Sequence, residues 1–139
     1  MSLNPYDSYI ESAVLTADPM ELVSMLIGGG LEAIARSRAA LAAGDIAGRS
    51  KEIVRAVSIL TELSLSVDRN RAPELGRNLI ELYDYMQRRL LEANASQQDA
   101  PLAEVERLLS TLREGWNQCR SAVLSESRQH EYEAVRLTA

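Results

Sequence analysis

The spacing of apolar residues constrains the fold of this chain more than any other feature. Apolar residues recur at intervals of three and four along almost its whole length, and no stretch between turn signals alternates strictly over four or more residues. The clearest series lies near the C-terminal end, at intervals of 4, 3, 4, 3 and 4: Val105, Leu109, Leu112, Trp116, Cys119 and Val123. The pattern predicts a chain built from α-helices.

Capping signals set the limits of the first two predicted helices. Asp18 can cap the first helix, and Pro19 suits its first position because that position needs no amide hydrogen. This helix is expected to end near Gly44. Asp45 can cap the second helix, which is expected to run to Arg69.

Proline and polar residues delimit the other two helices. The third is predicted to begin at Pro73 and to end near Asn94, which tolerates a left-handed conformation. A polar loop at 96–99 follows, and the fourth helix starts near Pro101. Short connections between long helices force neighbours to run antiparallel. The predicted fold is therefore all-α, an antiparallel up-down-up-down four-helix bundle with an N-terminal cap segment.

The length of 139 residues fits one domain, which removes roughly two-thirds of its unfolded surface from water. We expect residues 1–17 to form the N-terminal cap segment and residues 18–124 to form the four-helix bundle. The acidic and polar residues 125–139 are expected to form a mobile C-terminal tail.

Charge and hydropathy disfavour two classes of partner. A formal net charge of -5 does not attract phosphate backbones or anionic lipid, so nucleic acid is not an expected partner. No apolar run approaches the roughly 20 residues that span a bilayer, so membrane insertion is not expected. The N-terminal residues resemble no secretory leader, which predicts a cytoplasmic protein.

Residues that carry enzyme chemistry are almost lacking. His130 is the only histidine, and one histidine cannot supply the two Glu-x-x-His motifs of a di-iron bundle. Cys119 is the only cysteine; its place in the apolar series predicts a buried thiol. Trp116 belongs to the same series and is expected in the core, with a partner for its indole N–H. We therefore predict no catalytic residue, no cofactor and no metal.

Helices two and three carry more apolar residues than one core face needs. A projection at about 100° per residue places one arc of the third helix in the core. The members of that arc are Leu75, Leu79, Leu82, Met86, Leu90 and Ala93. Ile80 and Leu91 fall on another side of this helix, and Val54 and Leu65 fall outside the inner arc of the second helix.

These outlying residues allow two interpretations. They can form an outer hydrophobic groove for a partner helix, because contiguous exposed apolar surface marks interaction sites. They can equally be ordinary surface residues, or be covered by the segment from Tyr6 to Leu15. Gly28, Gly29 and Gly30 lie within the first helix at a cost of about 1 kcal/mol each, which predicts close approach of a neighbour at Gly29.

Four sequence strings resemble the flagellar secretion chaperone family of the FliS type. Two lie in the N-terminal part: Tyr6-x-x-Tyr9, and Val14-Leu15-Thr16-Ala17-Asp18-Pro19-x-Glu21-Leu22 followed by Met25-Leu26-x-x-Gly29-x-Leu31. The third is Leu82-Tyr83-Asp84-Tyr85-Met86-Gln87-Arg88-Arg89-Leu90-Leu91-Glu92-Ala93-Asn94, and the fourth is Leu109-x-x-Leu112-Arg113-x-x-Trp116. Their order and spacing agree with the family over roughly residues 4 to 120.

The resemblance implies a cytoplasmic export chaperone that binds the disordered C-terminal region of flagellin. Such a chaperone prevents premature polymerisation and supports delivery to the flagellar type III export apparatus; other flagellar regulators or export components are possible further partners. Carried over residue by residue, Tyr6, Tyr9 and Ile10 would form a displaceable cap over the binding surface. The residues implied for the groove are Tyr83, Met86, Arg89 and Leu90.

One departure concerns the first helix, where the family often has Tyr-Asp and this chain has Ile27-Gly28. Any contact that the tyrosine and aspartate make in the family is therefore in doubt here. The main rival hypothesis is a self-associating structural or adaptor bundle, which forms a homodimer through its outer apolar residues and binds no flagellin. An enzyme of unknown type is the third hypothesis.

Overall fold

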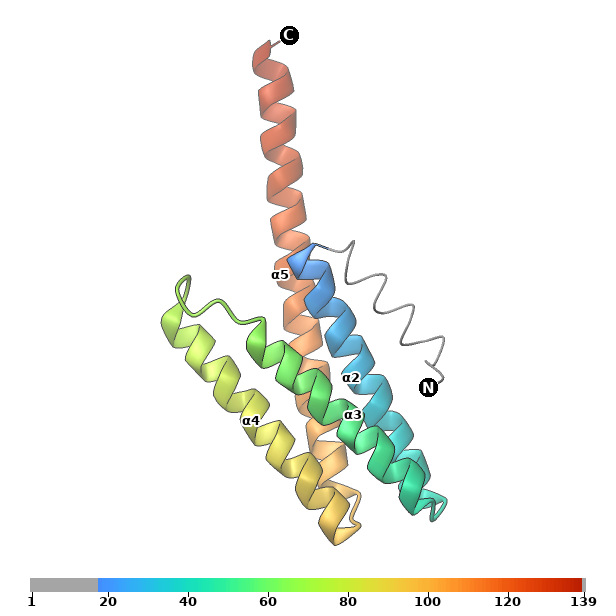
Figure 1. Ribbon diagram of the computed structural model, residues 1–139. Coiled ribbons are helices and arrows are strands. Elements are labelled where there is room, and N and C mark those ends of the chain that lie inside the picture. The colour runs from blue at the N-terminus through green and yellow to red at the C-terminus, as the bar shows by residue number, and fades with distance from the viewer. Residues whose placement is uncertain (1–17, 139) are drawn as a thin grey trace, which may run out of the picture.

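The computed structural model describes residues 18–138, which form four α-helices. They are α2 (Pro19–Ala42), α3 (Ile46–Leu65), α4 (Pro73–Ser96) and α5 (Ala100–Thr138). Figure 1 shows them running alternately up and down beside one another. Within the described part of the chain there is no strand. The prediction of an all-α, antiparallel four-helix bundle is confirmed.

Each helix packs against two neighbours. The helix α2 contacts α3 and α5, and α4 contacts the same two helices, so α2 and α4 occupy opposite corners of the bundle. The core lies along the bundle axis, with side chains from all four helices that are almost completely inaccessible to water. Its largest members are Ile27, Ile34, Ile53, Leu60, Leu63, Met86, Leu90, Leu102, Val105 and Leu109.

Both predicted aspartate caps are present. Oδ1 of Asp18 accepts a hydrogen bond of 2.8 Å from the backbone amide of Glu21. Oδ1 of Asp45 accepts a hydrogen bond of 2.9 Å from the backbone amide of Gly48. Each bond satisfies an amide that has no partner within its own helix. The starts of α2 and α3 therefore agree with the sequence-based expectation.

Two predicted helix ends were wrong. The helix α3 ends at Leu65 and not at Arg69, because Ser66 forms the C-cap and its hydroxyl also bonds back to the carbonyl of Leu63 at 2.7 Å. The left-handed residue after α4 is Gln97, with φ of 57°, and not Asn94. Asn94 stays helical, and its side chain accepts hydrogen bonds from Arg49 and Ser50 of α3.

Gly29 and Gly30 are both buried in α2, and Gly30 faces two other helices. A Cβ atom at Gly30 would lie 3.1 Å from Cδ2 of Leu109 in α5 and 3.4 Å from Cγ2 of Ile59 in α3. The missing side chain lets three helices meet. This close approach is at Gly30; the close approach predicted at Gly29 stays a prediction.

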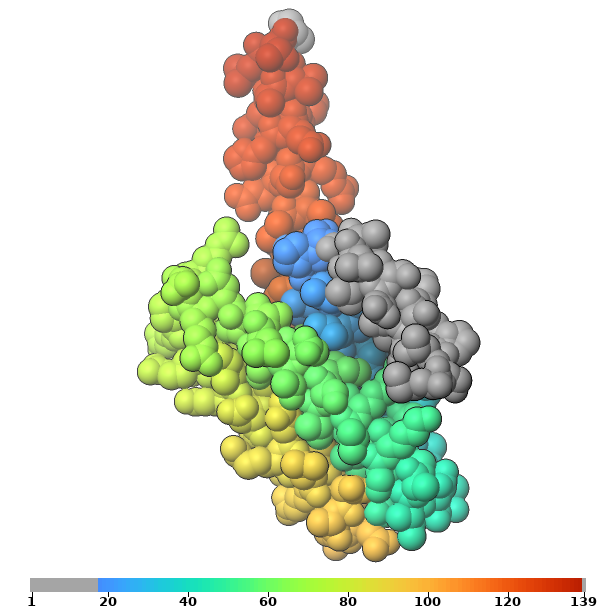
Figure 2. Space-filling model, viewed as in Figure 1, coloured from blue at the N-terminus to red at the C-terminus, as the bar shows by residue number. Residues whose placement is uncertain are grey.

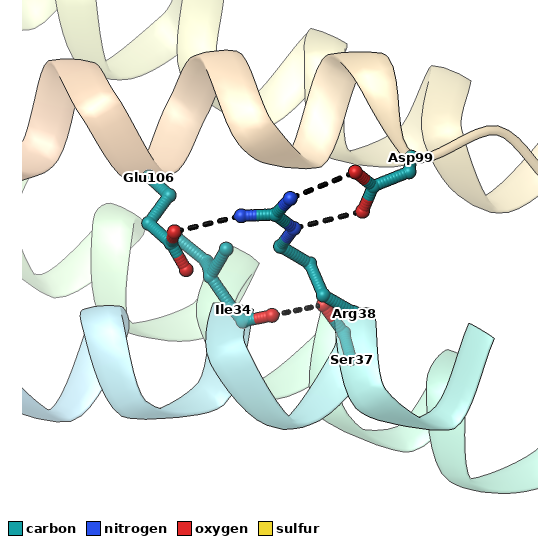
Figure 3. Close-up of polar contacts among 5 residues, drawn as sticks. All are labelled: Ile34, Ser37, Arg38, Asp99 and Glu106. Atoms are coloured by element: carbon teal, nitrogen blue, oxygen red, sulfur yellow. Dashed lines mark hydrogen bonds and ion pairs between the residues drawn. The ribbon is translucent and has the colours of Figure 1, made fainter. Parts of the chain in front are cut away.

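An arginine joins α2 to the start of α5 (Figure 3). Nε and Nη2 of Arg38 each lie 2.8 Å from a carboxylate oxygen of Asp99, and Nη1 lies 2.8 Å from Oε1 of Glu106. Beside it, the buried hydroxyl of Ser37 donates to the carbonyl of Ile34 at 2.7 Å. These bonds fix the far end of α2 against α5.

The helix α5 is much longer than predicted. It has 39 residues, about 58 Å at roughly 1.5 Å per residue, and its C-terminal part projects beyond the bundle (Figure 1). The helix therefore continues past residue 125, where the C-terminal tail was expected to begin. The chain has no glycine or proline between Trp116 and Thr138, so neither of the two strongest helix-breaking residues ends the helix there.

Candidate partner-binding surface

A hydrophobic groove lies between the first half of α4 and the middle of α5. It has a volume of about 480 Å³. Its walls come from three leucines of α4 and from the α5 residues that face them. The lining residues are Leu75, Leu79, Leu82, Leu108, Thr111, Leu112, Gly115, Trp116 and Cys119. We call this the α4/α5 groove.

The apolar side chains of the α4/α5 groove are incompletely covered by the bundle itself. Leu75 is 59% exposed, and Cys119 is exposed as well. Leu79 and Leu112 only half-bury their side chains against the core. Grooves of this volume are within the range of small binding sites, and apolar lining is typical of them.

Trp116 is held in place at one side of the groove. Its Nε1–H donates to the carbonyl oxygen of Met20 at 3.2 Å and to the hydroxyl of Ser24 at 3.0 Å, both in α2. The predicted need for an indole partner is thereby met. Because the polar edge of the ring is satisfied within the bundle, its remaining contact surface is apolar.

A polar cluster joins α4 and α5 beyond the groove. Glu104 of α5 accepts a hydrogen bond from the hydroxyl of Tyr85 and another of 3.3 Å from Nε of Arg89. The hydrogen bond with Tyr85, followed by those from Arg89, lowers the pKa of Glu104, and the same bond raises the pKa of Tyr85. Arg89 also pairs with Glu92 at 2.8 Å. The two helices are therefore tied together here, and the groove opens toward the start of α4.

Three of the outer apolar residues predicted as partner contacts are well exposed. Val54 is 59% exposed, Leu65 is 75% exposed and Leu91 is 53% exposed. Ile80 is half-buried and lines a smaller cavity of about 330 Å³ beside Pro73 and Arg77. Three of the four side chains are therefore accessible at the surface, and their contact with a partner stays a prediction.

The outer surface of α3 and α4 is nevertheless not a continuous apolar groove. In the helical projection Gln87 lies between Ile80 and Leu91, and Thr61 lies between Val54 and Leu65. Nε2 of Gln87 donates to the hydroxyl of Thr61 at 3.3 Å. A polar contact between the two helices therefore divides this surface into two apolar ends.

Three of the residues that the resemblance implied for the groove are buried in the core. Tyr83 is 3% exposed, and Met86 and Leu90 are 0% exposed. Burial also raises the pKa of the Tyr83 hydroxyl. Met86 and Leu90 belong to the core arc of α4 and Tyr83 lies beside it, so all three side chains are shielded from solvent in the bundle. Arg89 reaches the surface but belongs to the polar cluster with Glu104.

Sequence reasoning missed the main contributors to the α4/α5 groove. Leu75 and Cys119 were both expected in the core, and both are exposed. Each lies on the correct arc of its helix, but α4 and α5 do not close on each other at this end. Tyr6, Tyr9 and Ile10, the predicted cap residues, lie outside the described residues.

Two kinds of feature are missing from residues 18–138. No group of three or more histidine, cysteine, aspartate or glutamate side chains there is arranged to hold a metal ion. None of the described helices combines the length and apolarity needed to cross a membrane.

The chain is similar to known chaperones of flagellar secretion. A family model described as flagellar protein FliS matches residues 2–123. The flagellar secretion chaperone FliS of Salmonella typhimurium is 40% identical over 110 residues, which are 78% of this chain and 82% of the relative. The flagellar secretion chaperone FliS of Bacillus subtilis is 36% identical over 115 residues, which are 83% and 85% of the two chains.

A third relative, the flagellar secretion chaperone FliSB of Pseudomonas aeruginosa, is 39% identical over 108 residues, covering 78% of this chain and 86% of the relative. All three relatives are named as chaperones, a class without enzymatic activity. The family model and these relatives cover most of the described bundle. The chain belongs to the FliS family of flagellar secretion chaperones.

Proposed function

We propose that this protein binds the disordered C-terminal region of flagellin in the cytoplasm and that the α4/α5 groove is the principal contact surface. The bound segment is withheld from filament contacts, which prevents premature polymerisation. The complex then supports delivery of flagellin to the type III export apparatus. The observation that carries the proposal is the apolar groove on a member of a flagellar chaperone family.

The lining of the groove suits an amphipathic helix from a partner. Such a helix presents apolar side chains at intervals of three and four residues, which fit between rows of leucines on α4 and α5. Burial of apolar surface stabilises the complex by about 25 cal/mol per Å² and offsets the entropy lost when the disordered segment becomes ordered. Binding therefore requires no chemistry from the chaperone.

A longer segment has further apolar surface available on the other side of α4. Ile80 and Leu91 fall on the same helical face as Gln87, which contacts Thr61 of α3, whereas Leu75 opens into the α4/α5 groove. A flexible flagellin segment that crosses α4 can contact both surfaces. Disordered segments bind in this way because they can wrap around a large area.

The first test compares full-length flagellin with flagellin that lacks its C-terminal region. Capture of the full-length protein alone is the expected result. The variant Leu75→Asp places a charge in the groove, at an exposed position in the first turn of α4 where an acidic side chain is compatible with the helix. We expect this variant to lose capture, and the matched variant Leu137→Asp at the exposed end of α5 to keep it. Equal capture of truncated flagellin would contradict the proposal.

A further inference from the structure

The part of α5 that leaves the bundle has a surface that no described residue covers. From Ser121 to Thr138 every side chain is exposed, and Figure 2 shows this segment standing clear of the other helices. All but its first three residues lie beyond the match to the family model. An isolated helix of this length is only marginally stable, because most helix stability in proteins comes from packing of one face. We call residues 121–138 the extension.

One side of the extension has the spacing of a coiled-coil seam. At about 100° per residue, residues at successive intervals of 3, 4, 3, 4 and 3 fall on a single face. They are Ser121, Leu124, Arg128, Glu131, Val135 and Thr138. Leu124 is 47% exposed and Val135 is 68% exposed. We call this face the extension stripe. Val123 and Leu137 lie on another face, which continues the apolar series of α5 that begins at Val105.

The extension stripe is complementary to itself when its direction is reversed. In heptad notation, residues 121, 128 and 135 occupy the "a" positions and residues 124, 131 and 138 occupy the "d" positions. Two antiparallel copies that are related by a two-fold axis between residues 129 and 130 place each "a" residue opposite a "d" residue of the second copy. Leu124 then packs against Val135 of the second copy. Arg128 faces Glu131 of the second copy, and both contacts occur twice because of the symmetry.

Parallel pairing of the same stripe gives the opposite electrostatic result. Arg128 would face Arg128 of the second copy, and Glu131 would face Glu131. Like charges placed in direct contact disfavour an arrangement, whereas opposite charges fix register and orientation. The charge order of the stripe therefore selects the antiparallel arrangement.

We propose that the extension stripe is a self-association surface whose occupant is the extension of a second copy of this chain. In the antiparallel register Thr138 lies opposite Ser121, just beyond the point where the bundle of the other copy ends. The described extension therefore pairs along its whole length while the two bundles stay apart. Two charged layers lie at its centre and add more to specificity than to affinity, so the dimer is weak and dissociates on dilution.

Sedimentation of the full chain across concentrations from about 10 μM to about 1 mM tests this surface. The variants Arg128→Glu and Glu131→Arg each turn both ion pairs into like-charge contacts. We expect each to weaken dimerisation by about tenfold or more at low salt. In an equimolar mixture of the two variants, positions 128 and 131 of one chain are both acidic and those of the other are both basic. Opposite charges then face each other in both layers, so the mixture should dimerise again.

Matched controls separate the stripe from general charge effects. Arg136→Glu and Glu133→Arg make the same charge changes on the extension but outside the stripe, and they should leave dimerisation unchanged. Arg128 and Glu131 are also neighbours within one helix, but restoration in the mixture cannot arise from that contact. A wild-type chain that stays monomeric at about 1 mM, or a mixture that associates no better than its components, would overturn the proposal.

This dimer leaves the α4/α5 groove open. We therefore expect Arg128→Glu to capture flagellin as well as the wild-type chain does. Loss of self-association and loss of flagellin binding are in this way separate results, and either proposal can fail without the other.

Discussion

Arg38 in α2 and Asp99 in the loop before α5 form a two-pronged contact, with both nitrogen–oxygen distances at 2.8 Å. The hydrogen bonds from Arg38 lower the pKa of the Asp99 carboxyl. A carboxylate whose folded-state pKa is lowered stabilises the protein above its ordinary pKa, and this stabilisation is lost as the pH falls through the folded-state value. The pair is half exposed, so its contribution is small.

The first prediction concerns this pH dependence. Asp99→Asn should reduce the free energy of unfolding by no more than about 1 kcal/mol at pH 7, because solvent screens an exposed pair. The difference from the wild-type chain should shrink as the pH falls through the lowered folded-state pKa of Asp99, and it should disappear once the carboxyl is protonated in both the folded and the unfolded state. Urea unfolding across this pH range measures it, with Asp84→Asn as a control at an exposed carboxylate. An effect of Asp99→Asn that does not diminish as the pH falls would refute the explanation.

The second prediction distinguishes core from surface on α4. Leu90 is 0% exposed, whereas its neighbour Leu91 is 53% exposed. Leu90→Ala should lower the free energy of unfolding by about 2–5 kcal/mol, because it leaves a cavity. Leu91→Ala should change it by no more than about 0.5 kcal/mol. Denaturant unfolding of both variants provides the measurement, and similar values for the two would show that Leu90 is not a core residue.

The third prediction compares two glycines of α2. A Cβ atom at Gly28 would meet nothing within 4 Å, whereas one at Gly30 would lie 3.1 Å from Leu109. Gly28→Ala should therefore raise the free energy of unfolding by about 0.5–1 kcal/mol through helix propensity alone. At Gly30 the tight contact opposes the same gain, so Gly30→Ala should stabilise less or destabilise. Greater stabilisation by Gly30→Ala than by Gly28→Ala, measured by denaturant unfolding, would contradict the packing described here.

The sequence predicted the parts of the fold that depend on local signals. Asp18 and Asp45 were recognised as caps because a cap needs only the right side chain before a helical run. The core arc of α4 followed from helical periodicity, and it correctly included Met86 and Leu90. The partner contacts that the resemblance implied for Met86 and Leu90 stay a prediction.

The candidate site depends on how two helices meet, and periodicity does not contain that information. Leu75 and Cys119 lie on arcs that a tightly closed bundle would bury, yet both stay exposed because α4 and α5 separate at that end. The end of α5 was missed for a related reason. Its polar composition indicates the absence of core contacts, but it does not prevent a helix from continuing to Thr138.

The central claim is that the C-terminal region of flagellin binds in the α4/α5 groove. Trp116 is the only tryptophan of the chain and lines this groove, so its fluorescence reports directly on occupancy. A tryptophan-free C-terminal flagellin segment, titrated by fluorescence and calorimetry, is expected to bind 1:1. Its binding should shift the emission to shorter wavelength and give a negative heat capacity change.

The same titration with two variants tests the location of binding. Leu75→Asp should weaken binding by about tenfold or more, because it places a charge among apolar side chains of the groove. Leu137→Asp should bind like the wild-type chain. A segment that produces neither heat nor a change in Trp116 fluorescence, or that binds Leu75→Asp as tightly as the wild-type chain, would contradict the account.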